Sequence, residues 1–261
     1  MCTVVLAAHV FEGHPLVVLA NRDEDLDRAS SPPRVWSASN AANGGRSFIA
    51  PRDDVAGGTW LGVNDAGVFV GITNRYLGPR DPARASRGTI VTEALALGSA
   101  RAIHEAMATV PASRHNGFHL VYADATDVLA TASNGTHLAQ LTLGRGIHTI
   151  TERSFGAGND GPRRARIHAA WTRLAPSDEL DLPRLSQLLT EHDDADLLAA
   201  TCIHVPGMRY GTRSGAAIAI AADRDRSRML WAEGPPCTTP FVPVDLSLLG
   251  VPGVPGPAKT V

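Results

Sequence analysis

The order in which β-rich and helical segments follow one another most constrains the fold of this chain. Short runs of aliphatic and β-branched residues occur in pairs joined by turn-forming residues, which predicts β-hairpins. The first pair is TVVLAAHV and LVVLAN, separated by FEGHP. The expected strands cover residues 3–10, 16–21, 59–64, 68–74, 118–124, 127–133, 136–143, 146–151, 214–223 and 227–234.

Helical spacing separates these strand blocks. The Ala- and Leu-rich segment 89–110 predicts two helices with a break at Gly98. Further helices are expected over residues 162–174, where Pro162 suits a first helical position, and over 182–192. Polar stretches at 22–47 and 75–88 predict loops.

Segregated strand and helix blocks argue against alternating βαβ units. They favour an α+β fold in which two mainly antiparallel sheets have helices on the outside. The first two strands are apolar on both faces, so we expect their sheet to be covered on both sides. No internal repeat or interior linker is visible, which predicts a single domain over residues 1–242. Residues 243–261 are rich in Pro and Gly and are expected to form a tail.

Charge, hydropathy and cysteine usage exclude several classes of protein. The net charge of −2 gives no excess of positive charge that would indicate binding to nucleic acid. No apolar run approaches the roughly 20 residues of a membrane span, and the start lacks the features of a secretory signal. Three cysteines without a CxxC pair argue against a disulfide framework or a structural zinc site. This usage fits a reducing compartment, so we expect a cytoplasmic protein.

Cys2 is the first candidate for chemistry. If Met1 is removed, Cys2 carries a free α-amine, and that amine has a pKa of about 8, which suits a base at neutral pH. A nucleophile and its base would then share one residue. The alternative is that Cys2 is a small apolar residue at the start of a buried strand.

Two further motifs lie at strand ends. In ANRDED (20–25), hairpin pairing would place Arg22 and Asp23 beside Cys2, where Arg22 could hold a thiolate or substrate and Asp23 could bind the α-ammonium. The alternative is a solvated charged turn. In GITNR (71–75), Asn74 could donate its amide N–H to an oxyanion, or could simply end a strand.

Four motifs in this order, MCT, ANRDE, GTWLGVNDAGVFVGITNR and YGTRSGAAIAI, resemble the NRDE family, which is the Transport and Golgi organisation 2 family. This family in turn is similar to the choloylglycine hydrolase and penicillin V acylase group of N-terminal-nucleophile hydrolases. The resemblance covers residues 2 to about 233. It implies a four-layer αββα sandwich and Cys2 as the nucleophile once Met1 is lost.

The resemblance also implies roles for other residues. Arg22 and Asp23 correspond to an arginine and an aspartate of the amidases, although the Arg-x-x-Asp spacing of those enzymes selects Asp25 instead. Asn74 and Asn159 correspond to the two oxyanion asparagines. Arg213 in YGTRS corresponds to a late arginine of the site.

Two functions therefore remain open at this stage. The first is an N-terminal cysteine hydrolase or acyltransferase that acts on a linear, non-peptide C–N amide bond of a small-molecule amide or acyl substrate, with no metal or organic cofactor. The second is a non-enzymatic protein that binds haem or a lipid-like ligand in the same groove, in line with the family's link to haem trafficking and lipid homeostasis.

Other candidates carry less weight. His115 and His119 have a helical metal-ligand spacing, but Asn116-Gly117 lies between them and a strand begins there. Cys237 could ligate haem iron or be a free thiol in its proline-flanked loop. The arginines at 163, 164 and 166 stand on the first turn of a helix and face either solvent or an anionic ligand group.

Overall fold

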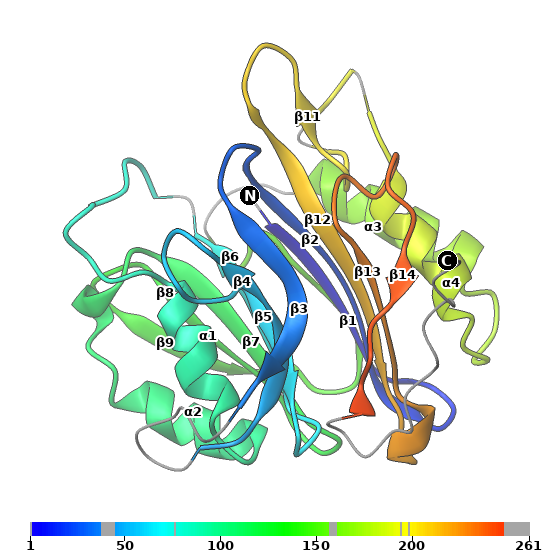
Figure 1. Ribbon diagram of the computed structural model, residues 1–261, viewed down its shortest axis with the longest axis horizontal. Coiled ribbons are helices and arrows are strands. Elements are labelled where there is room, and N and C mark those ends of the chain that lie inside the picture. Colours follow the sequence, from blue (N-terminus) through cyan, green and yellow to red (C-terminus); the bar gives the residue numbers. More distant parts are fainter. Residues whose placement is uncertain are drawn as a thin grey trace, which may run out of the picture.

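The computed structural model describes residues 2–37, 45–75, 77–156, 161–193, 195–197 and 199–247. Two seven-stranded sheets lie face to face, and helices cover the outer face of each (Figure 1). The architecture is the expected α+β, four-layer αββα sandwich. No helix within the described ranges is long and apolar enough to cross a bilayer.

The first sheet, which we call sheet A, contains both the first and the last described strand. Its strand order is β10-β1-β2-β12-β13-β14, with β11 paired to β12, and every pairing is antiparallel. The strands are β1 (Cys2–Phe11), β2 (His14–Asp25), β10 (Gly146–Ile150), β11 (His204–Val205), β12 (Tyr210–Ile220), β13 (Arg228–Ala232) and β14 (Val242–Pro243).

The second sheet, sheet B, follows chain order from β3 to β9 and is antiparallel throughout. Its strands are β3 (Ser30–Trp36), β4 (Phe48–Asp53), β5 (Leu61–Asn64), β6 (Phe69–Asn74), β7 (Phe118–Ala123), β8 (Val128–Ser133) and β9 (Leu138–Thr142). The hairpins β5–β6 and β7–β8 are those that the turn residues predicted, whereas β6 and β7 pair although residues 75–117 separate them.

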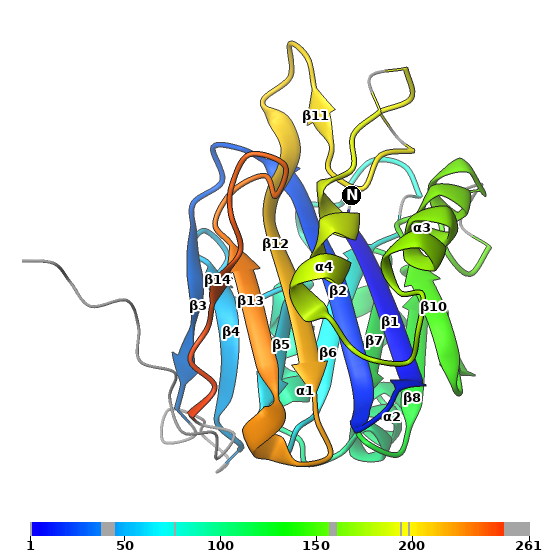
Figure 2. The same ribbon diagram turned by 90° about the vertical axis from the view of Figure 1, so that its right-hand side faces the viewer.

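Among the described residues, each outer layer holds two α-helices. On sheet B these are α1 (Gly88–Leu95) and α2 (Ala100–Ala108), and the expected break at Gly98 is confirmed: the next residue, Ser99, caps α2 by accepting the Ala102 N–H. On sheet A, α3 (Gly161–Leu174) and α4 (Leu182–Ser186) lie across the strands, and a 3-10 turn (Gln187–Thr190) follows (Figure 2). Other 3-10 turns are Ala112–Arg114 and Arg224–Arg226.

Strands β1 and β2 are buried on both faces, which explains their continuous apolar sequence. Val4 and Leu6 pack into the core shared with sheet B, whereas Val5 and Ala7 pack against the helices α3 and α4. The strand pair is thus the wall between two cores. Successive residues of β1 and β2 therefore face in turn the space between the sheets and the helical layer.

The expected loop over residues 22–47 is wrong in two places. β2 continues through the charged residues to Asp25, because β12 pairs with it along that length. Residues Ser30–Trp36 form β3 despite Pro32 and Pro33, since this strand lies at a sheet edge and the prolines fall in a register shift, where no ladder donor is needed. Residues 38–44 lie outside the described residues.

The boundary expected at Pro243 is also shifted. Val242–Pro243 pairs with β13 as β14, and Leu246 is buried in the main core. The dense Pro/Gly stretch of the sequence starts only at Gly250, and Pro243 itself lies in a strand, so composition alone placed the boundary too early. Residues 248–261 of the expected tail lie outside the described residues.

Candidate active site

Cys2 begins β1 and faces the space between the two sheets. In the antiparallel pairing of β1 with β2 it is directly opposite Arg22. Both residues stand on the strand face that carries Val4 and Val18, and Cys2 is 7% exposed. The hairpin therefore brings the thiol and the guanidinium together, as strand pairing predicted.

A cavity of about 270 Å³ opens at this point between the sheets. It draws residues from the ends of β1, β2, β4 and β6 and from the segments before β5 and α1. Its lining residues are Cys2, Arg22, Glu24, Arg28, Asp53, Thr59, Trp60, Ile72, Asn74, Arg80, Ser86, Arg87 and Gly88. Four arginines thus face two carboxylates, so the lining carries an excess of positive charge.

Arg22 is held in place by an ion-pair network that joins the two sheets. Its Nη2 lies 3.2 Å from Asp53 Oδ2, which also accepts a hydrogen bond of 2.8 Å from Arg28 Nε. Glu24 lies 3.8 Å from Arg22 and 3.9 Å from Arg28. The Arg22 side chain is only 6% exposed, so a charge-assisted contact with Asp53 fixes it against the cavity wall.

Burial raises the pKa of the Cys2 thiol above its ordinary value. The nearby Asp23 carboxyl raises this pKa further, whereas Arg22 lowers it. The sulfur is therefore a thiol at neutral pH, and a nucleophilic role requires a base that takes its proton.

Asp23 lies on the opposite face of β2, toward the helical layer. It is 2% exposed, and its Oδ1 accepts a hydrogen bond of 2.6 Å from Thr212 Oγ1 on β12. Burial raises the pKa of Asp23 to about 6, against the lowering effects of Thr212 and Arg163. Asp25, the alternative from motif spacing, is exposed, and its Oδ1 accepts from the Asp27 N–H.

The three remaining candidates differ in position. Asn74 ends β6 and lines the cavity, as expected for a residue that could meet an oxyanion. Arg213 stands in a register shift of β12 opposite the Arg22–Asp23 segment, and its guanidinium lies 3.7 Å from Glu233. The structure does not bring Arg213 into the described cavity lining. Asn159 lies outside the described residues.

Several cavity residues were not identified from the sequence. Asp53 ends β4, and Arg80 and Arg87 come from a segment interpreted only as a loop. Nothing local in the sequence marks Asp53 as a partner of Arg22. Trp60, by contrast, is expected from the sequence as a core or groove-lining residue; it is buried, lines the cavity, and its Nε1 has no hydrogen-bond partner among the described residues.

The arginine group at the start of α3 has structural partners. Arg163 is buried, and its Nη1 lies 3.1 Å from Glu152 and 3.4 Å from Thr3 Oγ1. Arg164 donates to Ser154 Oγ, and Arg166 forms an ion pair with Asp193. The expectation that these side chains face solvent or a ligand is therefore wrong for Arg163, which ties α3 to β1.

The two histidines with helical spacing have separate partners. His115 Nδ1 lies 3.1 Å from the Ala85 carbonyl, and the buried His119 Nδ1 lies 3.0 Å from that of Thr151. A different group combines the ligand types that metals prefer. It consists of His192, Cys202, His204 and Cys237, outside the described cavity lining.

The fold defines the structural class of this chain. The chain has the fold of the N-terminal-nucleophile hydrolases. It is similar to penicillin V acylase from Agrobacterium tumefaciens, with a TM-score of 0.50 and 14% identity over 95% of this chain and 86% of that one. A conjugated bile acid hydrolase variant from Clostridium perfringens gives a TM-score of 0.57 and 13% identity over 97% and 95% of the two chains.

Within this class, the chain belongs to the Transport and Golgi organisation 2 family, whose model matches residues 1–231. It is 26% identical over 246 residues to the Transport and Golgi organization protein 2 homologs of Bos taurus and Homo sapiens. Each alignment covers 80% of this chain and 83% of the relative. The expected family and fold are thus confirmed.

Proposed function

We propose that this protein is an N-terminal cysteine hydrolase, or the related acyltransferase, that acts on a linear, non-peptide C–N amide bond of a small molecule. One observation carries the proposal: a polar cavity between the sheets reaches Cys2 at the start of β1, in a fold of the N-terminal-nucleophile class. Removal of Met1 would place an α-amine beside the Cys2 sulfur. Such an amine supplies the base that a buried thiol requires.

The proposed reaction has two halves. The α-amine takes the Cys2 thiol proton while Sγ attacks the carbonyl carbon of the substrate. The resulting tetrahedral oxyanion accepts a hydrogen bond from the Asn74 side-chain amide, and Asn159 is proposed as a second donor. The C–N bond then breaks, and the α-ammonium returns its proton to the departing amine. Water, or an acceptor amine in acyl transfer, attacks the acyl-cysteine thioester and regenerates the thiol.

Charged groups around Cys2 would order this chemistry. We assign Asp23 to orient the α-ammonium, because its carboxyl is buried beside Cys2 and held by Thr212. Arg22 is opposite Cys2 and would hold the substrate against the sulfur. Arg213 is proposed as a positioning residue that acts through the strand segment it opposes.

The cavity also indicates the kind of substrate. The excess of arginine over carboxylate favours a substrate with an anionic group, such as a carboxylate or a phosphate. A volume of about 270 Å³ suits a small acyl or amine moiety. These features give no support to the haem- or lipid-binding alternative within the described residues. A cytoplasmic location remains part of the proposal, on the basis of the unpaired cysteines.

The decisive experiment is intact-mass analysis of the purified full chain before and after treatment with p-nitrophenyl acetate, an acylating probe. In samples quenched with acid before the thioester is hydrolysed, we expect loss of one Met and one acetyl adduct that the Cys2→Ala variant does not acquire. Arg101→Gln is the control, because it changes an exposed side chain away from the cavity and should keep the adduct. A retained Met1 together with an unreactive Cys2 would overturn the proposal, and haem and lipid titrations would then be the next measurements.

A further inference from the structure

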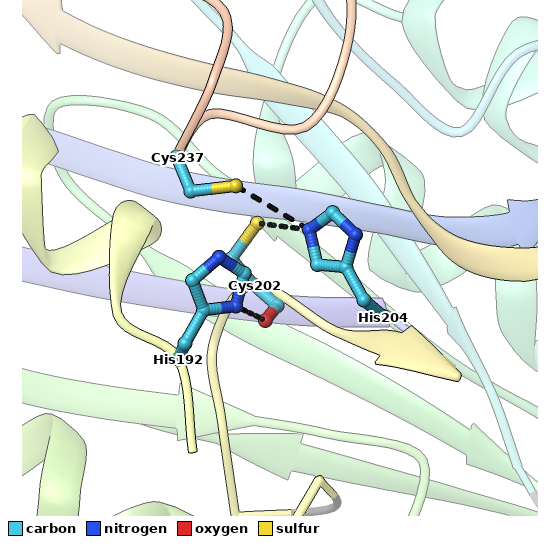
Figure 3. A group of neighbouring side chains, drawn as sticks. All are labelled: His192, Cys202, His204 and Cys237. Atoms are coloured by element: carbon cyan, nitrogen blue, oxygen red, sulfur yellow. Dashed lines mark hydrogen bonds between the residues drawn. The ribbon is translucent and has the colours of Figure 1, made fainter. Parts of the chain in front are cut away.

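We propose that His192, Cys202, His204 and Cys237 form a structural, tetrahedral zinc site (Figure 3). The four side chains come from three segments: the loop after the 3-10 turn Gln187–Thr190, the β11 region, and the loop between β13 and β14. The lack of a CxxC pair argued against such a site in the sequence. In the folded chain, three segments that are distant in sequence bring the four side chains together without a CxxC pair.

The ligand atoms lie close enough together to surround one ion, and two of their separations match tetrahedral coordination. One ligand atom from each residue can be chosen so that all four lie within 4.8 Å of one another. Cys237 Sγ is 3.3 Å and Cys202 Sγ is 3.7 Å from His204 Nε2. Bonds of about 2.3 Å to sulfur and about 2.0 Å to nitrogen place tetrahedral ligands roughly 3.3–3.8 Å apart. Two thiolates and two imidazoles in this geometry are the donor set that zinc prefers.

The orientation of His192 supports the same interpretation. Its Nδ1 lies 2.9 Å from the backbone carbonyl oxygen of Cys202, a contact that requires the proton on Nδ1 (Figure 3). The Nε2 lone pair is then free to bind a metal. Ligating histidines in proteins commonly use the second ring nitrogen in this way, and the contact fixes both the tautomer and the ring plane.

Backbone hydrogen bonds hold the segments that carry the cluster. The Thr201 and Cys202 N–H groups both donate to the Glu191 carbonyl, which closes the loop between His192 and Cys202. The Thr238 and Thr239 N–H groups both donate to the Pro235 carbonyl, in the turn that carries Cys237. The ligands therefore require little reorganisation to meet an ion.

The site would also stabilise the surroundings of Asp23. The Ile203 N–H donates over 2.8 Å to Thr212 Oγ1, which donates over 2.6 Å to Asp23 Oδ1. Asn21 Nδ2 donates over 2.8 Å to the Thr201 carbonyl. A metal bound to Cys202 and His204 would thus stabilise the segment that contacts β2 on its helical-layer side. The zinc proposal itself does not depend on the proposed hydrolase activity.

A disulfide between Cys202 and Cys237 is the competing interpretation. It would account for the two sulfurs but not for two histidines whose ring nitrogens converge on them. Such a bond would also leave the His192 tautomer without a role. The metal explains all four side chains with one ion.

The test is the zinc content of the full chain, purified under reducing conditions from zinc-supplemented culture. We expect about one zinc per chain by plasma mass spectrometry, as for a closed four-ligand site. Cys237→Ser and His204→Gln, which alter less buried ligands, should lose most of it. Cys2→Ser removes a cysteine outside the cluster and should retain it. Replacement by Co²⁺ should give the intense visible bands of tetrahedral thiolate coordination.

A thermal scan with a chelator makes the test independent of variant folding. The chelator should lower the Tm of the unaltered chain and leave that of Cys237→Ser unchanged. Absence of zinc from the reduced, unaltered chain, together with no thiolate-to-Co²⁺ bands, would overturn the proposal. A mass two hydrogens lower, with Cys202 and Cys237 both resistant to alkylation until reduced, would overturn it in favour of the disulfide.

Discussion

Cys2 and Arg22 are opposite each other in the ladder between β1 and β2, and both face the cavity between the sheets. Since side chains alternate along a strand, a shift of one residue in this ladder would turn one of the two into the helical layer. The pairing of β2 with β12 on its other side opposes such a shift. The register of three strands thus maintains the thiol–guanidinium pair.

Replacing Cys2 by alanine should abolish hydrolysis while leaving the fold intact. The sulfur is the proposed nucleophile, and loss of one small buried group costs only about 1 kcal/mol of stability. Activity on an N-acyl substrate and urea unfolding of the same sample measure the two effects. A variant that keeps wild-type turnover would show that another group performs the chemistry.

Asn74→Ala should lower kcat by a factor of about 10²–10³, the usual loss when one oxyanion donor is removed. KM should change little, because the interaction strengthens only as the oxyanion forms. Steady-state kinetics distinguish the two constants. A rise in KM with an unchanged kcat would assign Asn74 to ground-state binding instead.

Asp23→Asn should change stability in a pH-dependent manner. The carboxyl has a pKa of about 6 in the folded chain and of about 3.9 when unfolded, so folding favours its protonated form. The resulting stability is present below about pH 4 and is lost as the pH rises through about 6, with a total of about 3 kcal/mol. The variant should therefore gain in relative stability between pH 4 and pH 8, as urea unfolding at both pH values would measure.

Asp25→Asn on the same strand is the matched control for that experiment, because Asp25 is exposed. Asp23→Asn should also lose activity, since a neutral amide cannot hold the α-ammonium as a carboxylate does. Equal pH dependence of the wild type and the Asp23 variant would contradict the raised pKa. Full activity of the variant would contradict the proposed role.

Arg80→Gln should raise KM about tenfold for substrates with an anionic group and leave KM for neutral amides unchanged. Arg80 is exposed at the cavity rim, so its loss removes attraction without emptying the core. Arg101→Gln is the control, because Arg101 is an exposed arginine of α2 away from the cavity lining. A parallel rise for neutral substrates would indicate a general disturbance of the site.

Glu152→Ala should destabilise the fold by about 3–5 kcal/mol, because it removes the buried carboxylate that lies 3.1 Å from Arg163 Nη1. Replacing both Arg163 and Glu152 by apolar residues should cost less than the single change. Chemical denaturation of the single and double variants tests this order. A single variant as stable as the wild type would show that the ion pair contributes nothing net.

The sequence predicted those parts of the fold that local patterns encode. Hairpins such as the one that joins β1 to β2 have both strands and the turn within about two dozen residues, so alternation and turn residues suffice. The extension of β2 through charged residues was missed because its partner β12 lies far along the chain. Local polarity favoured a loop, and tertiary pairing overrode it.

The candidate site was also predictable from the sequence only where local patterns encode it. The adjacency of Cys2 and Arg22 follows from one hairpin and was predictable. The contact of Arg22 with Asp53 depends on how sheet B packs on sheet A, which no local pattern encodes. The convergence of Cys202 with Cys237 likewise depends on two loops that meet only in the folded chain.

The two prolines of β3 have a consequence for the behaviour of the protein in concentrated solution. An open sheet edge presents unpaired N–H and C=O groups that can pair with a second chain and start aggregation. β3 borders sheet B, and its Pro32 and Pro33 remove two donors and interrupt the register. Sheet A ends in the two-residue β14, which contains Pro243. Each sheet therefore has at least one border that resists intermolecular strand addition.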